Sequence, residues 1–172
     1  MKTYSYSIEE ILSKNAVSFF IPPFQRPYAW GRPEIERFFE DIQNIIKSEL
    51  DENQKDKLEH FFGTIVLKEE TEGFSSKWLI IDGQQRLTTV LLFLIALRDL
   101  EEDSKNRKVI DNLYLVNPSS GFQDKIKLKQ VTKDWDAYRA LIKGEQPIPG
   151  NISRAYDLLK KLIKIASQGI LM

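Results

Sequence analysis

The residues best suited to chemistry lie where a predicted strand passes directly into a predicted helix. The sequence there reads KWLIIDGQQRLTTVLLFLIALR, and Asp82 and Gly83 separate the two elements. The first turn of a helix has unpaired backbone N–H groups and the positive end of the helix dipole, which together favour anions. The polar residues of this turn stand in an otherwise hydrocarbon segment: Gln84, Gln85, Arg86, Thr88 and Thr89. We therefore predict an anion pocket at the start of this helix.

The residue types at this junction suit phosphate groups. Gly83 lets the backbone turn with a positive φ or approach a ligand closely. Arg86 can hold a phosphate through two parallel hydrogen bonds. Asp82 could hold a magnesium ion, usually through water, or orient Arg86. The alternative interpretation is a plain Asp-Gly turn followed by a helix cap, because both are common without any function.

A second unusual segment, IPPFQRPYAWGRP at residues 21–33, is predicted to form a wall of the same pocket. Proline residues stiffen it and so lower the entropy cost of holding one shape. We expect Gln25 and Arg26 to face the anion, and Tyr28 or Trp30 to offer a ring that stacks on a base. The alternative is a loop that its aromatic residues merely fix to the core.

Several elements must position these residues, and their mixture predicts an α/β or α+β fold. A capping box at Ser7 and Glu10 predicts a short helix, and apolar residues at spacings of three and four predict a helix from Pro33 to Leu50. The helix that starts at Gln84 is apolar nearly all round, so it must be central and buried. The other predicted elements are strands at 17–21, 61–68, 77–81, 113–116 and 126–128, a polar turn at 69–76, a helix around 135–142 and a last helix capped by Asn151 or Ser153.

Composition excludes several classes of protein. The 172 residues include no cysteine and one histidine, which excludes a disulfide scaffold, a thiol nucleophile and zinc sites built from Cys or clustered His. The longest uncharged apolar run, 87–97, is too short for a bilayer, which needs roughly 20 residues. The start of the sequence lacks a secretory signal pattern, so a cytoplasmic location is expected. With 25 basic and 25 acidic residues, the domain is not expected to hold nucleic acid by bulk electrostatics.

Three strings together resemble a known family: FQRPYAW at 24–30, FGTIVL at 62–67 and IDGQQRLTT at 81–89. In order and spacing they are similar to the DUF262 domain, the N-terminal domain of GmrSD-type, type IV modification-dependent restriction enzymes. The resemblance covers nearly the whole chain. It implies one domain over 1–172 with a ParB/sulfiredoxin-like α/β fold, in which helices pack a small mixed sheet. The core is expected at about 1–116, with a helical extension at 117–172.

The resemblance also implies a nucleoside triphosphate site, usually with Mg²⁺, and NTP hydrolysis coupled to cleavage of modified phage DNA. The residues expected to bind nucleotide and phosphate are Gln25, Arg26, Tyr28, Gly83, Gln84, Arg86, Thr88 and Thr89. Those expected to take part in hydrolysis are Asp82, as a magnesium ligand or a holder of water, Gln85, as a holder of water, and Arg86.

The nuclease of such systems is typically a separate domain with a His-Asn-His signature, which this sequence lacks. We therefore expect either the N-terminal part of a longer protein or a half that needs a nuclease partner. The base of the NTP, the DNA modification and the oligomeric state, a homo-oligomer included, stay open. Two alternatives remain: a non-enzymatic module that recognises DNA or a modified base, and a structural domain with a degenerate site.

Overall fold

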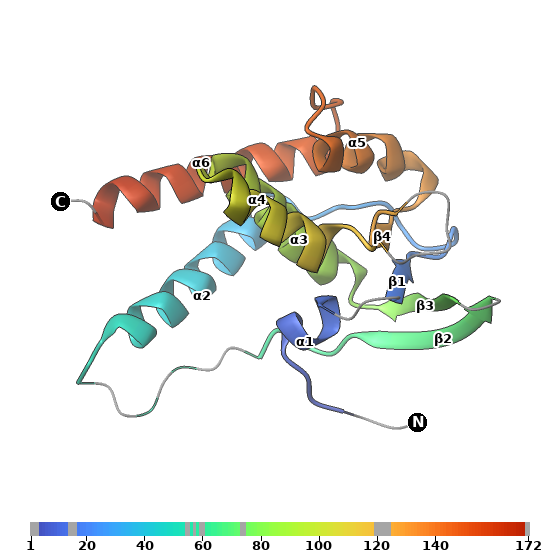
Figure 1. Cartoon of the computed structure of the whole chain (residues 1–172), viewed down its shortest axis with the longest axis horizontal. Helices are drawn as coiled ribbons and strands as arrows, with labels where there is room; N and C mark the ends of the chain where they lie inside the picture. The colour runs from blue at the N-terminus through green and yellow to red at the C-terminus, as the bar shows by residue number, and fades with distance from the viewer. Residues whose placement is uncertain are drawn as a thin grey trace.

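A mixed four-stranded sheet packed with helices forms the fold, in agreement with the predicted mixed α and β class. The computed structural model describes residues 4–13, 17–53, 56, 58, 61–72, 75–118 and 125–170. Its elements, in chain order, are α1 Ile8–Leu12, β1 Val17–Phe20, α2 Arg32–Leu50, β2 Val66–Glu72, β3 Ser75–Asp82, α3 Gln84–Leu100, α4 Ser104–Ile110, the π-helix η1 Asp111–Leu115, β4 Leu128–Lys129, α5 Thr132–Lys143 and α6 Asn151–Ile170. Figure 1 shows the sheet at one end of the molecule, with α3 between the sheet and α6.

The sheet has the strand order β2-β3-β1-β4. Strand β1 runs parallel to β3 and to β4, whereas β2 pairs antiparallel with β3. The carboxyl ends of β1, β3 and β4 therefore meet at one edge. In open sheets of this kind the crevice beyond the carboxyl ends is where ligands bind.

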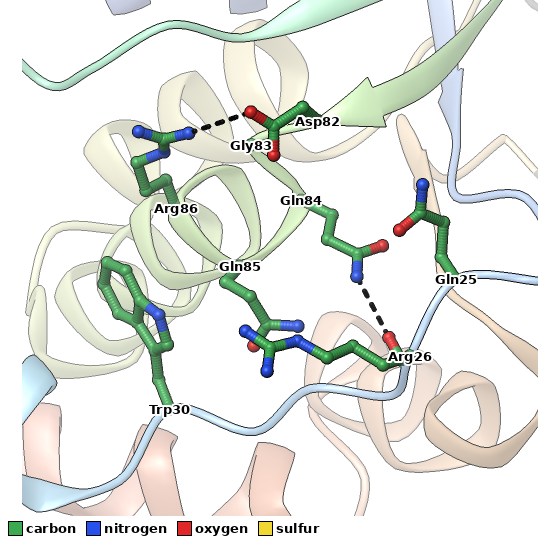
Figure 2. A pocket seen from close by; sticks show the side chains of 8 residues that line it. All are labelled: Gln25, Arg26, Trp30, Asp82, Gly83, Gln84, Gln85 and Arg86. Carbon is green, nitrogen blue, oxygen red and sulfur yellow. Dashed lines mark hydrogen bonds and ion pairs between the residues drawn. The ribbon is translucent and has the colours of Figure 1, made fainter.

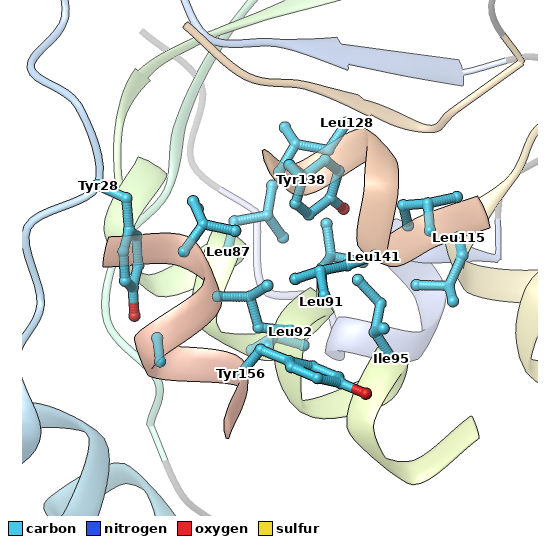
Figure 3. Packing of buried hydrophobic residues seen from close by; sticks show 14 of the residues in the cluster. Tyr28, Leu87, Leu91, Leu92, Ile95, Leu115, Leu128, Tyr138, Leu141 and Tyr156 are labelled. Atoms are coloured by element: carbon cyan, nitrogen blue, oxygen red, sulfur yellow. The ribbon is translucent and has the colours of Figure 1, made fainter. Parts of the chain in front are cut away.

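Helix α3 is the centre of the core, as its apolar sequence predicts. Leu87, Leu91, Leu92 and Ile95 are fully buried, and the helix packs against α6. Figure 3 shows these side chains among Tyr28 of the loop after β1, Leu128 of β4, Tyr138 of α5 and Tyr156 of α6. One apolar cluster thus joins the predicted core region to the predicted helical extension.

The starts of α1 and α2 follow the sequence rules. The Ser7 hydroxyl accepts a hydrogen bond from the Glu10 N–H at 3.1 Å, and the Glu10 carboxylate accepts one from the Ser7 N–H at 2.6 Å, so the capping box is confirmed. Helix α2 carries Pro33 in its first turn, where the missing N–H costs nothing. It ends at Leu50, as the apolar spacing predicts.

The prediction for the hairpin was wrong in two places. The strand predicted at 61–68 begins only at Val66, because Gly63 adopts a φ of +96° and turns the chain out of the extended shape. The polar turn predicted at 69–76 is largely strand, since β2 runs to Glu72 and β3 begins at Ser75; residues 73 and 74 lie outside the described part. Strand β2 is at the edge of the sheet, where charged side chains stay in water and are tolerated.

The strand predicted at 113–116 was also wrong. The chain continues from α4 into the π-helix η1, and only Val116 makes a single bridge, to Ile126. The Arg98 guanidinium donates to the Asp111 carboxylate at 2.9 Å, and Leu115 is fully buried. These tertiary contacts override the weak strand propensity of the segment.

No helix in the described part of the chain is both long and apolar enough to cross a membrane.

Candidate functional site

A pocket of about 320 Å³ lies at the edge where the carboxyl ends of the parallel strands meet. Figure 2 shows its lining residues: Gln25, Arg26, Trp30, Asp82, Gly83, Gln84, Gln85 and Arg86. The loop after β1 supplies one side of the pocket, while the end of β3 and the start of α3 supply the other. The two segments that the sequence singled out are therefore brought together.

The start of α3 presents open hydrogen-bond donors to this pocket. Gly83 precedes the helix with a φ of +90°, and no side chain caps the first turn. A Cβ at residue 83 would lie 3.0 Å from Ile65 Cγ1 and 3.2 Å from the Thr64 carbonyl oxygen, so the turn also lacks room for a side chain. The first N–H with a bonded partner is that of Leu87, to the Gly83 carbonyl at 3.0 Å. Among the residues that the structure describes, none accepts from the three N–H groups at 84–86.

Arg86 is held at the rim of the pocket. Its Nη2 donates to the Thr64 carbonyl at 2.9 Å and lies 3.7 Å from the Asp82 carboxylate, while 29% of its side chain stays exposed. A guanidinium has five N–H donors, and these contacts leave some of them available. Arg86 can therefore still take an anion from the pocket side.

The amides of Gln84 and Gln85 tie the loop to α3. Gln84 Nε2 donates to the Arg26 carbonyl at 3.1 Å. Gln85 Oε1 accepts from the Ala29 N–H at 2.8 Å, and its Nε2 donates to the Pro27 carbonyl at 3.2 Å. Both polar atoms of Gln85 are therefore in use. Gln84 Oε1, in contrast, is buried without a partner among the described residues, and such an orphaned acceptor costs about 1–3 kcal/mol unless water or a ligand donates to it.

Arg26 offers the pocket an uncompensated positive charge. Its backbone carbonyl is bonded to Gln84, but within the described ranges its guanidinium makes no hydrogen bond or ion pair. Figure 2 shows this guanidinium beside Gln85, on the side of the pocket where Trp30 lies. The Gln25 side chain is fixed against the end of β3, because its Nε2 donates to the Ile81 carbonyl at 2.9 Å.

Three predicted binding residues lie in the core instead of lining the pocket. The Tyr28 ring is 2% exposed, and its hydroxyl lies 2.8 Å from Thr89 Oγ1; burial raises the pKa of Tyr28 to about 12. Thr89 is fully buried and also donates to the Gln85 carbonyl at 2.8 Å. Thr88 is buried and accepts from Gln130 Nε2 at 2.9 Å. The aromatic side chain that does line the pocket is Trp30.

Three residues that shape the site were not among the predicted site residues. Gly63 leaves room for the Arg86 guanidinium, and a glycine inside a strand-like string is the kind of signal that indicates a close backbone approach. Asp134 and Asn151 both hydrogen-bond the backbone of Tyr28. They are more than 100 positions from Tyr28 in the chain, and no local pattern links either of them to the loop.

Of the residues that the structure describes, Asp82 is the one carboxylate that lines the pocket. The described part of the chain holds no cluster of three or more His, Cys, Asp or Glu side chains that could bind a metal ion. Mg²⁺ commonly binds through one or two carboxylates together with water and substrate phosphates. The Asp82 side chain is 69% exposed beside the open start of α3, so it fits that kind of site and no closed metal cage.

A model of the family described as "GmrSD restriction endonuclease, N-terminal domain" matches residues 8–167. The match runs from α1 into α6 and includes every residue of the pocket. No curated protein matches the chain.

Proposed function

The chain belongs to the family of GmrSD restriction endonuclease N-terminal domains, and from that premise we propose that it binds and hydrolyses a nucleoside triphosphate within a modification-dependent DNA restriction system. Membership makes the chain a module of a restriction and phage-defence system. The observation that carries the proposal for nucleotide is the open start of α3 at the carboxyl edge of the sheet, where an unpaired guanidinium from Arg26 also lies.

The pocket matches a polyphosphate in charge and in donors. Open N–H groups at 84–86 coincide with the positive end of the α3 dipole. Arg26 and Arg86 add a positive charge from each of the two segments that line the pocket. Phosphate oxygens would thus meet backbone donors in the middle and guanidinium groups at the sides. The orphaned Gln84 Oε1 would accept from a hydroxyl, an amino group or a bound water of the same ligand.

Asp82 is the residue that would hold Mg²⁺, and when bound the ion neutralises charge on the phosphate oxygens. Hydrolysis would split a phosphoanhydride bond by attack of water on the terminal phosphorus. Gln85 stays a predicted holder of this water; because its amide is bonded to the loop, it would have to release Pro27 or Ala29 first. Hydrolysis would regulate a nuclease carried by another domain or subunit, which also brings DNA.

Titration of labelled NTPs against the wild type and two variants tests the binding site. Arg86→Ala and Arg26→Ala should each weaken affinity roughly 10- to 100-fold, the loss expected for hydrogen bonds to a charged group. Arg107→Ala is the matched control, because Arg107 is exposed on α4 and does not line the pocket. Equal affinity in the wild type and Arg86→Ala would sink the proposal.

Trp30 supports one second candidate, a module that recognises a DNA phosphate or a modified base. Its indole lines the pocket beside the free Arg26 guanidinium, and an aromatic face next to a cation suits a base and its phosphate. Such a module should lose affinity steeply as salt rises and should ignore NTPs. Binding of neither DNA nor any NTP would leave a structural domain with a degenerate site.

A further inference from the structure

We propose that Asp134 and Asn151 are positioning residues of the nucleotide pocket. They act through the backbone of Tyr28, and by fixing it they set where Arg26 and Trp30 stand opposite α3. As a statement about nucleotide, this inference rests on the proposed function; as a statement about the loop, it rests on the geometry alone.

The peptide groups of Tyr28 are held from two helices at once. Asp134 Oδ2, in the first turn of α5, accepts from the Tyr28 N–H at 2.6 Å. Asn151 Nδ2, at the first residue of α6, donates to the Tyr28 carbonyl at 2.8 Å. Tyr28 stands two residues from Arg26 and two from Trp30, so this double contact grips the middle of the wall segment.

The same short segment is held from its other side by α3. Gln84 bonds the carbonyl of Arg26, and Gln85 bonds the carbonyl of Pro27 and the N–H of Ala29. Side chains from three helices thus engage the backbone at four consecutive residues, 26–29. With the Tyr28 ring in the core, the side chains of Arg26 and Trp30 are left for the pocket.

The burial and bonding of the Asp134 carboxylate suit a residue whose role is to position the backbone of Tyr28. Asp134 is 7% exposed, and within the described part of the chain the Tyr28 N–H supplies the one hydrogen bond of its carboxylate. Burying a carboxylate with so little compensation opposes folding. The contact does fix a backbone donor that would otherwise be buried and unpaired, at the point where the loop passes α5.

Fixing the loop before the ligand arrives should raise affinity, because the ordering cost of Arg26 and Trp30 is then met in the free protein. Loosening Tyr28 should therefore weaken nucleotide binding even though neither Asp134 nor Asn151 lines the pocket. It should also let the amide hydrogens of the loop exchange faster with solvent.

The experiment compares Asp134→Ala, Asn151→Ala and the conservative Asp134→Asn by titration of labelled NTP and by hydrogen exchange over residues 26–31. The two alanine variants should weaken NTP binding by up to about tenfold, as loss of one hydrogen bond to the loop backbone implies, and should speed exchange at Tyr28 and Ala29. Asp134→Asn should recover both readouts, because its amide oxygen can accept from the Tyr28 N–H. Ser153→Ala is the matched control: it removes a part-buried hydrogen bond, to the Ile148 carbonyl, from the same turn of α6 without touching Tyr28.

The inference is overturned if both alanine variants bind NTP and exchange as the wild type does, or if Ser153→Ala has the same effects as Asn151→Ala. If Asp134→Ala does not fold, Asn151→Ala and Asp134→Asn decide the outcome. If the wild type binds no nucleotide, the proposed function falls, and exchange then decides the positioning role: faster exchange in Asn151→Ala keeps it, and unchanged exchange rejects it.

Discussion

The guanidinium of Arg86 occupies the space that a side chain at Gly63 would need. A Cβ built on Gly63 would lie 2.1 Å from Arg86 Nη1 and 3.0 Å from Arg86 Cζ. Gly63 also has a φ of +96°, and the next residue, Thr64, supplies the carbonyl that accepts from Arg86 Nη2. The segment before β2 therefore acts as a seat for this arginine.

Gly63→Ala should displace Arg86 and weaken NTP binding about as much as Arg86→Ala does, roughly tenfold or more. It should also destabilise the fold by about 1 kcal/mol, because alanine is strained at positive φ. Gly144→Ala is the control, since Gly144 has a φ of +69° with open space around it. Binding titrations and denaturant unfolding of both variants give the comparison.

The two effects should also be non-additive. With alanine already at residue 86, Gly63→Ala should cause no further loss of affinity, because the clash partner has gone. A full additional loss in the double variant would show that Gly63 does not act through Arg86.

Loss of the hydroxyl group should change the stability of the fold differently at two buried tyrosines. Tyr28→Phe removes a bond to Thr89 Oγ1 and should cost about 1 kcal/mol of stability. The Tyr138 hydroxyl is buried and finds no hydrogen-bond partner in the described part of the chain, so Tyr138→Phe should be neutral or stabilising by up to roughly 1 kcal/mol. Denaturant unfolding measures both, and an equal loss in the two variants would contradict the assignment of these hydroxyls.

Lys127 should make stability depend on pH in the alkaline range. Its ammonium is buried and, among the residues that the structure describes, donates to the carbonyls of Leu12 and Leu113 alone; burial lowers the pKa of Lys127 from 10.5 to about 8. Between these values the unfolded chain binds more protons than the folded one, so the free energy of unfolding should rise as pH rises. From pH 8 to pH 10 the gain should be on the order of 2 kcal/mol.

Lys127→Met should abolish that rise, and Lys105→Met, at an exposed site on α4, should keep it. Denaturant unfolding at pH 7, 8, 9 and 10 makes the measurement. The range stops there because tyrosines of the unfolded chain, with an ordinary pKa of 10.0, lose protons around pH 10, which opposes folding: burial raises the pKa of Tyr28 to about 12 in the folded protein. The difference between the wild type and Lys127→Met isolates the contribution of the lysine. Parallel curves for the wild type and Lys127→Met would refute the prediction.

Trp30 should report on the ligand through its fluorescence. Since its indole lines the pocket, NTP binding should change the emission of the wild type. Trp30→Phe should lose that change, whereas Trp135→Phe should keep it, because Trp135 belongs to α5 and does not line the pocket. An unchanged response in Trp30→Phe would place the ligand elsewhere.

Local signals predicted the centre of the site. The strand, the Asp-Gly turn and the apolar helix are adjacent in sequence, so their residue types alone placed Asp82, Gly83 and Arg86 at the start of α3. The same rules could not tell which polar residues of the helix line the pocket and which lie deeper, in the core. Thr88 and Thr89 stand a full turn beyond Gln84 and Gln85, which on a helix buried nearly all round places them inside the core.

Contacts between distant parts of the chain lay beyond such rules. Proline-rich loops have no fixed period, so nothing in FQRPYAW showed that Tyr28 would point inward while Arg26 and Trp30 line the pocket. Asp134 and Asn151 are far from that loop along the chain, and α2, β2, β3 and α3 are among the elements between them. A capping role was the most that the sequence around Asn151 offered. The π-helix at Asp111–Leu115 was equally hidden, because its shape depends on tertiary packing.

The shared apolar cluster limits how far the chain can be shortened without losing its core. Leu12 near one end and Leu159 near the other belong to the same core, with α3 between them. A shortened chain that ends at residue 116 would lack α5 and α6, which leaves a large hydrophobic surface of α3 exposed. Such a surface is prone to aggregation. The shortened chain would also lack both side chains that grip Tyr28, so crystallographic soaking trials need a piece that extends at least through Leu159.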